Sequence, residues 1–422
     1  EEDINDAIHR IVPSEYKNTW QQLDNPLYAF KKIAKGPKIK KPKHIFLIVG
    51  ESIPQWSLDE THKLLNICPG LWDFKSQPNT VQIPNFLPAG NVSRPSIVSL
   101  MSGVYDAGLE LNEREQFWNG SFPTSFAYQM KQLGYQTIYW YGGNASYGNF
   151  NHFGKAQGFD RVESASIFCG PDAPKTWVGV YDHIFLENIE QQIKALDTPT
   201  FHFIYTTSNH SPYKIEDSLL DYDPATVMPH VGEDLRSNKT RNKELATYRY
   251  SDKALFSFVD SMKKAYPDSL FIITGDHSNL FGSLNNTSLI HRDYTLRDTF
   301  CTVALLQHPD LDSNVIATQK GTHMSLMPTI IEAIAPKGFE YYSITPSLFD
   351  DQPETLVTPY QWITDSLMGD IRSDYGESNQ PSAEPVTQIR PIDNHAKEAR
   401  DWSLLTTWLI NHEEKLFSKK DD

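Results

Sequence analysis

Two apolar segments, each ending in a glycine followed by an acid, constrain the fold more than any other feature of this sequence. Residues 45–50 read Ile-Phe-Leu-Ile-Val-Gly before Glu51, and residues 271–275 read Phe-Ile-Ile-Thr-Gly before Asp276 and His277. Continuous apolar runs of this length are typical of strands buried on both faces of a parallel sheet. Ligands bind beyond the carboxyl ends of such strands, so we expect these polar residues to form one site.

Strand-like and helix-like segments alternate along the chain from residue 44 onward. Strands are predicted at 44–50, 135–141, 200–206, 269–274 and 299–306. Helices are predicted near 93–102, 122–133, 180–196, 246–265 and 324–334. This alternation predicts an α/β fold with a largely parallel sheet that is covered on both faces.

We expect three parts along the chain: a lead-in over 1–43, a main α/β domain over 44–339 and a smaller C-terminal subdomain over 340–422. The polar lead-in ends in a lysine-rich stretch. It is interpreted as solvated, or alternatively as a tether that follows a membrane anchor. In the C-terminal part we expect a loop over 375–395 and a final helix over 397–417.

The composition excludes several classes of protein. With 38 basic and 53 acidic residues, the net charge of −15 argues against nucleic acid as a partner. A hydrophobic fraction of 39% excludes a disordered chain. The three cysteines are too scattered for a zinc cluster, and one disulfide with one free thiol is left open. The chain begins with glutamate and carries neither a signal peptide nor a run of about 18–20 apolar residues, so we expect a processed or truncated product.

Ser93 opens the segment Ser-Arg-Pro-Ser and is predicted to cap a helix that ends at Gly103. Together with Glu51, Asp276 and His277 it would offer two carboxylates, an imidazole and a hydroxyl, which suit one divalent ion such as manganese, zinc or magnesium. A metal-bound hydroxyl becomes a nucleophile towards phosphorus or sulfur. The alternatives are ordinary helix caps at Ser93 and Glu51, and a surface Asp276–His277 pair.

The segment Ser93–Gly103 resembles the nucleophile segment of sulfatases, Cys/Ser-x-Pro-Ser-Arg followed by a helix ending Leu-x-Thr-Gly. Ile48–Ser52, Thr207–Tyr213 and Gly275–Ser278 resemble segments of lipoteichoic-acid-synthase-type phosphoglycerol transferases. Phosphoethanolamine transferases share this alkaline-phosphatase-like superfamily. The same template is matched by Gly158-Phe159-Asp160, by Tyr248 with Asp252, and by His323.

This resemblance implies an alkaline-phosphatase/sulfatase-like fold and one divalent metal ion held by Glu51, Ser93, Asp276 and His277. It implies that Ser93 is the nucleophile, and that His210 contacts the oxygens of the substrate or protonates the leaving group. The implied partners are a phospholipid or phosphoglycerol-type donor, a glycan or lipid acceptor and a membrane surface. The implied place is the periplasmic or extracellular face of a bacterial inner membrane, reached through an N-terminal anchor that this sequence lacks.

The sequence departs from the family pattern at several positions. Ile97 replaces the arginine of the sulfatase signature, and Ser93 stands where the transferases commonly have threonine. Tyr147-Gly148-Asn149-Phe150 replaces their Phe-Trp-Asn-Arg, so the arginine that binds phosphate there is missing. Met324-Ser325 stands where an aspartate is common.

The leading hypothesis is a metal-dependent phosphotransferase or phosphodiesterase that forms a covalent intermediate on Ser93. The missing sulfatase arginine is the main reason to prefer phosphorus over sulfur. The first alternative is a sulfatase in which Ser93 is the precursor of formylglycine. The second is a catalytically silent ectodomain that binds lipid or a partner protein.

Overall fold

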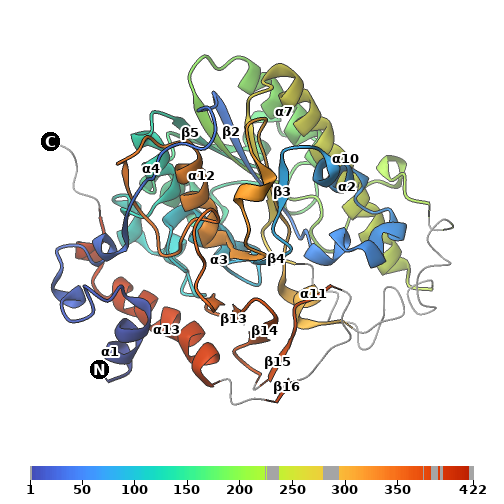
Figure 1. The fold of residues 1–422 in the computed structure, drawn as a ribbon. Coiled ribbons are helices and arrows are strands. Elements are labelled where there is room, and N and C mark those ends of the chain that lie inside the picture. Colours follow the sequence, from blue (N-terminus) through green and yellow to red (C-terminus); the bar gives the residue numbers. More distant parts are fainter. Residues whose placement is uncertain are drawn as a thin grey trace.

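A seven-stranded sheet runs through the centre of the computed structural model, in the order β3-β9-β8-β2-β7-β5-β6 (Figure 1). The structure describes residues 2–223, 225, 237–278, 294–373, 375–381, 388–389 and 393–417. The strands are β2 (His44–Gly50), β3 (Thr80–Gln82), β5 (Gln136–Tyr141), β6 (Arg161–Ser164), β7 (Thr200–Tyr205), β8 (Leu270–Gly275) and β9 (Ala304–Gln307). Neighbours from β8 to β6 are parallel, while β9 and β3 are antiparallel to their neighbours. The predicted α/β fold with a largely parallel sheet is confirmed.

Helices cover both faces of this sheet. Successive side chains of a strand point to opposite faces, so a strand that is apolar throughout presents an apolar surface on each side that must be buried. In β2, Ile45, Leu47 and Val49 enter one apolar core, and Phe46 and Ile48 enter the other. The first core is completed by α3 (Ser93–Ser102), α4 (Phe126–Gln132), α5 (Phe150–Ala156) and α12 (Leu326–Ile334). The second is completed by α2 (Pro69–Ser76), α7 (Asp182–Lys194) and α10 (Lys239–Ala265).

The strand predicted over 299–306 is wrong in its first half. Residues Leu296–Phe300 form the short helix α11 instead. Thr295 and Asp298 form a capping box there, in which each side chain accepts a hydrogen bond from the backbone of the other. Close to α11, β4 (Asn85–Leu87) forms a bridge between Phe86 and Thr302 and pairs in parallel with β10 (Lys320–Thr322). The short helix α6 (Ala165–Phe168) follows β6 at the other end of the sheet.

The lead-in is folded rather than solvated, which corrects the sequence-based interpretation. It contains α1 (Glu2–Ile11) and β1 (Lys31–Ile33), and β1 pairs with β11 (Glu340–Tyr342). Trp20 and Leu27 are each only 1% exposed. The sequence carried a signal for α1 that was not used, because Ile4, Ala7, Ile8 and Ile11 recur at helical spacing. The isolated apolar residues that follow, such as Trp20 and Leu27, show no such pattern.

The C-terminal part forms a five-stranded antiparallel sheet, visible at the bottom of Figure 1. Its strands are β12 (Leu356–Val357), β13 (Gln361–Ile363), β14 (Leu367–Asp370), β15 (Tyr375–Ser378) and β16 (Gln388–Ile389). The final helix, α13, spans Asp393–Ile410, packs against α1 and is followed by a 3-10 turn, η13 (Glu413–Lys415).

The loop predicted over 375–395 is therefore wrong over 375–378, 388–389 and 393–395, whereas residues 379–381 form neither helix nor strand, as predicted. Residues 382–387 and 390–392 of that prediction lie outside the described residues. The ring of Trp362 packs where a Cβ on Gly369 or Gly376 would stand, at 2.3 and 2.7 Å. Because Gly369 and Gly376 have no side chain, they leave room for the Trp362 ring. They also interrupt the alternation of apolar and polar residues by which a strand is recognised, so the sequence did not predict these strands.

No described helix combines the length and the apolar character needed to cross a bilayer. Cys68, Cys169 and Cys301 are all free thiols, so the disulfide left open by the sequence is not formed.

Candidate metal and nucleophile site

The register of the two central strands brings two acids together. Gly50 of β2 pairs with Gly275 of β8. Glu51 and Asp276 therefore leave adjacent parallel strands at the same level. This is the arrangement that the repeated glycine-plus-acid pattern predicted.

Glycine at both strand ends has one physical reason, which is that Ile53 passes close to both of them. A Cβ on Gly50 would lie 2.2 Å from Ile53 Cδ1. A Cβ on Gly275 would lie 2.8 Å from the Ile53 carbonyl oxygen and 2.3 Å from Thr302 Oγ1. A side chain at Gly275 would meet the backbone of Ile53, and one at Gly50 would require the Ile53 side chain to move, so glycine at both strand ends suits the close passage of this segment.

Glu51, Asp276 and His277 each offer a potential metal-ligating atom, and these atoms lie within 4.8 Å of one another. His277 Nε2 lies 3.5 Å from Glu51 Oε1 and 3.5 Å from Asp276 Oδ2. All three residues are buried. Two buried carboxylates need a cation or several hydrogen-bond donors to offset the loss of water.

Ser93 completes the cluster from the start of α3. Its Oγ lies 3.4 Å from Glu51 Oε2 and 3.4 Å from His277 Nε2. The expectation that Ser93 is the N-cap is wrong, because Val92 holds that position and Ser93 is the first helical residue. The hydroxyl therefore faces the acids instead of the helix backbone. The helix ends at Gly103 in the left-handed conformation (φ +71°), as predicted.

The charges of the cluster are strongly coupled. Burial opposes ionisation of Glu51, but the contact with His277 outweighs it and lowers the pKa of Glu51 to about 2. Burial and the nearby charge of Glu51 raise the pKa of Asp276 to about 6. Burial disfavours the imidazolium of His277, yet Asp276 and Glu51 raise its pKa to about 10. The site thus attracts positive charge.

The individual donor atoms fit a divalent ion. The carbonyl oxygen of Ser278 lies against His277 Nδ1, so Nδ1 carries a proton and Nε2 faces the carboxylates. Asp276 Oδ1 accepts hydrogen bonds from the backbone N–H groups of Ser52 (2.8 Å) and His277 (2.9 Å), which leaves Oδ2 facing His277 Nε2. Two carboxylates, one imidazole and one hydroxyl suit manganese, zinc or magnesium.

Tyr205, at the end of β7, belongs to the same cluster and was missed by the sequence analysis. Its hydroxyl donates to Glu51 Oε2 (2.8 Å) and lies 3.0 Å from Asp276 Oδ2. Tyr205 pairs with Val49 across β7 and β2, so it shares the face of the sheet on which Glu51 follows two residues later. No local pattern marks Tyr205, because its role depends on which strand lies beside β2.

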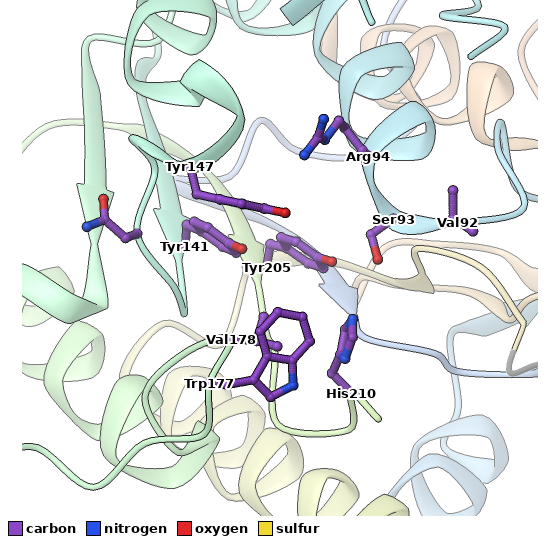
Figure 2. Close-up of a pocket in the computed structure, with 10 residues that line it drawn as sticks. Val92, Ser93, Arg94, Tyr141, Tyr147, Trp177, Val178, Tyr205 and His210 are labelled. Atoms are coloured by element: carbon purple, nitrogen blue, oxygen red, sulfur yellow. The ribbon is translucent and has the colours of Figure 1, made fainter. Parts of the chain in front are cut away.

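A cavity of about 410 Å³ opens beside Ser93 (Figure 2). Its lining consists of Val92, Ser93, Arg94, Tyr141, Asn144, Tyr147, Trp177, Val178, Tyr205 and His210. The rings of Tyr141 and Tyr205 are stacked, with centroids 5.3 Å apart. Trp177 meets His210 edge to face at 5.1 Å. The structure thus places His210 on the same cavity as Ser93.

Other residues singled out by the sequence have structural contacts. Asp252 Oδ2 and Oδ1 accept hydrogen bonds from the N–H groups of Gly70 (2.7 Å) and Leu71 (3.0 Å) at the start of α2. His323 joins the N–H of Ala89 to the carbonyl of Gly275. Ile97 is 1% exposed and packs in the core.

Comparisons with known proteins agree with this architecture. A family model described as Sulfatase matches residues 43–335. Lipoteichoic acid synthase 1 of Bacillus subtilis (strain 168) is 23% identical over 255 residues, which cover 57% of this chain and 38% of that protein. The chain thus spans well under half the length of this curated relative.

Two solved structures are similar over nearly the whole chain. An alkaline phosphatase superfamily protein from Vibrio parahaemolyticus superposes with a TM-score of 0.70 at 19% identity, covering 99% of this chain and 97% of that chain. The lipoteichoic acid synthase LtaP from Listeria monocytogenes gives 0.70 at 15% identity, covering 97% and 98%. The expected alkaline-phosphatase/sulfatase-like fold is confirmed.

Proposed function

This chain belongs to the sulfatase family, and we propose that it is a metal-dependent phosphotransferase or phosphodiesterase acting on phosphoglycerol- or phosphoethanolamine-bearing lipids. The observation that carries this proposal is the position of Ser93 Oγ, 3.4 Å from both Glu51 Oε2 and His277 Nε2. A serine hydroxyl at the edge of a candidate metal cluster, facing an open cavity, has the geometry of a nucleophile.

In this proposal Glu51, Asp276, His277 and Ser93 hold one divalent ion. When bound, the ion lowers the pKa of the serine hydroxyl and offsets the negative charge of the substrate. Ser93 Oγ forms a bond to phosphorus as the bond to the lipid alkoxide breaks, and the released diacylglycerol takes up a proton. A hydroxyl of a glycan or lipid acceptor, or water, then attacks phosphorus and frees Ser93.

We assign the proton transfer, or a contact with the substrate oxygens, to His210. The Ser211 carbonyl accepts from His210 Nδ1 at 2.7 Å, so Nε2 of the neutral ring keeps its lone pair. The edge-to-face contact with Trp177 keeps the ring in place beside the cavity. A neutral imidazole can accept a proton at Nε2, and as the imidazolium it can then donate that proton to the leaving alkoxide.

Phosphorus is preferred over sulfur for two reasons. First, one curated relative is named lipoteichoic acid synthase 1, and a solved structure that matches nearly the whole chain is the lipoteichoic acid synthase LtaP. Ile97, at the position of the sulfatase arginine, packs in the core and offers no charge to the cavity. We also propose that the protein lies at the periplasmic or extracellular face of a bacterial inner membrane, since one structure of similar fold is the periplasmic domain of EcEptC from Escherichia coli. We also place the reaction in the main domain, 44–339, with 340–422 as a smaller subdomain.

The deciding experiment is to incubate the protein with manganese and fluorescent phosphatidylglycerol or phosphatidylethanolamine and to measure the release of diacylglycerol. Mass spectrometry of the quenched protein should find the head-group phosphate on the peptide that contains Ser93. No release from either lipid, with no adduct on that peptide, would contradict the proposal.

The same spectra test the two alternatives. The sulfatase alternative, motivated by the description of the family model, requires formylglycine at position 93. Unmodified serine in an active preparation excludes it. A catalytically silent protein would bind lipid equally well with and without metal and release no diacylglycerol.

A further inference from the structure

Arg94 is the only permanently charged cation among the described residues that line the cavity beside Ser93. Its guanidinium carbon lies 5.4 Å from the centroid of the Tyr147 ring, and Figure 2 shows the two side chains next to each other. Arg94 follows Ser93 directly at the start of α3, where the helix dipole is positive. The cavity thus has one guanidinium on its wall, beside the start of α3.

The guanidinium is held in place but keeps free donors. Its Nη1 lies 3.4 Å from Glu110 Oε1 and 3.3 Å from Glu113 Oε1. Within the described residues, Nε and Nη2 make no hydrogen bond. The side chain of Glu110 is 61% exposed, and exposed pairs of this kind contribute little to stability. One edge of the fork is thus left for a ligand that can accept two N–H groups.

The segments that hold Arg94 are themselves joined. Glu113, in the 3-10 turn η5 (Leu111–Glu113), accepts from Asn149 Nδ2 at 2.5 Å. Asn112 Nδ2 of the same turn donates to the carbonyl of Gly148 at 2.6 Å. Asn149 and Gly148 lie in η7 (Tyr147–Asn149), which carries the ring that contacts Arg94. The ring and the guanidinium are therefore arranged before any ligand arrives.

We propose that Arg94, supported by the ring of Tyr147, binds the anionic oxygens of the substrate ester at the mouth of the cavity. This inference rests on the proposed function, because it assigns a contact to the same phosphate or sulfate ester. An anionic ester that approaches Glu51 and Asp276 is repelled by them. A guanidinium on the outer wall offsets this repulsion, and its planar fork matches two oxygens of a tetrahedral anion.

The test is a binding experiment that needs no turnover. sn-Glycerol 1-phosphate is titrated calorimetrically into the Ser93→Ala protein in the presence of manganese, with and without Arg94→Gln. We expect Arg94→Gln to weaken binding roughly tenfold, because one charge-assisted contact is lost. Arg94→Lys should weaken it less, since the charge stays and the fork is lost.

Arg161 is a matched control. It pairs with Glu163 and lies 5.3 Å from the ring of Trp140, and its side chain is 33% exposed against 31% for Arg94, but it does not line the cavity. Arg161→Gln should leave the affinity for glycerol phosphate unchanged. Equal affinity in the Arg94→Gln and Arg94 proteins would overturn the inference, and so would an equal loss in Arg161→Gln.

Two further experiments cover the cases in which Arg94→Gln does not fold or the protein does not turn over lipid. If Arg94→Gln does not fold, Tyr147→Leu keeps the charge, removes the supporting ring and should still weaken binding. Full affinity in that variant would count against the inference. If the unmodified protein binds glycerol phosphate through Arg94 but releases no diacylglycerol, the proposed function fails and the anion subsite stands.

Discussion

The hydroxyl of Tyr205 lies 2.8 Å from Oε2 of Glu51, inside the cluster of candidate metal ligands. The same hydroxyl is 3.0 Å from Asp276 Oδ2, although it has one proton to share between the two carboxylates. The ring is fixed by stacking on Tyr141, with an interplanar angle of 5°. Tyr205 therefore bridges the two carboxylates.

The first prediction concerns this hydroxyl. We expect Tyr205→Phe to lower manganese affinity roughly tenfold, because partners that orient metal ligands typically contribute this much. Calorimetric titration of manganese measures the effect. Tyr139→Phe is the control, since Tyr139 is also buried in the sheet but its hydroxyl has no hydrogen-bond partner among the described residues. Equal affinity in both variants would refute the role of Tyr205.

The second prediction separates the proposed nucleophile from a structural serine on the same helix. Ser93→Ala should abolish turnover of the lipid substrate and leave the free energy of unfolding nearly unchanged. Ser96 is fully buried and its hydroxyl is bonded to both the N–H (2.9 Å) and the carbonyl (3.0 Å) of Gly90. Ser96→Ala should cost about 1–3 kcal/mol of stability. The folded Ser96→Ala protein should keep its activity. Urea denaturation measures the loss of stability in both variants, and the diacylglycerol-release assay measures their turnover.

The third prediction is that metal affinity rises with pH. The neighbouring acids outweigh burial and hold the pKa of His277 at about 10, so the metal-free protein carries a proton on Nε2 at neutral pH. A metal ion must displace that proton, and the free protein binds more protons than the complex. The affinity for manganese should therefore increase by up to about tenfold for each unit of pH, as long as the pH is below the pKa of His277.

Calorimetry in buffers of different ionisation enthalpy measures the protons released. His277→Gln should bind manganese weakly and lose this part of the pH dependence. A wild-type affinity that is constant between pH 6 and pH 8 would show that Nε2 carries no proton to displace.

The fourth prediction concerns the end of the helix that carries Ser93. Gly103 has φ +71°, and a Cβ there would lie 2.0 Å from the carbonyl oxygen of Thr124. Gly338 has φ +93° with nothing within 4 Å of a Cβ. Gly338→Ala should cost only the backbone strain of about 1–2 kcal/mol. Gly103→Ala should cost about 1–3 kcal/mol more, because Thr124 must move. Urea denaturation compares the two, and equal losses would mean that the contact relaxes freely.

Much of the fold could be predicted because its signals are local. The apolar runs at 45–50 and 271–275 are long enough to identify buried parallel strands, and Gly103 ends its helix at the expected residue. Glu51 and Asp276 could be paired from the sequence for the same reason, since parallel strands end at one edge of a sheet. The C-terminal strands were missed because their contacts, such as Trp362 on Gly376, join residues that show no periodic pattern.

By itself, the sequence determined the parallel sheet and the edge at which its acids meet, since hydrophobic periodicity and strand-end residues act over a few neighbouring positions. Only the tertiary structure decided that β7 lies beside β2 and brings Tyr205 to Glu51. It alone also decided that Arg94 lies against Tyr147. The physical reason is that strand order and side-chain contacts depend on how distant segments pack together, which no local pattern encodes.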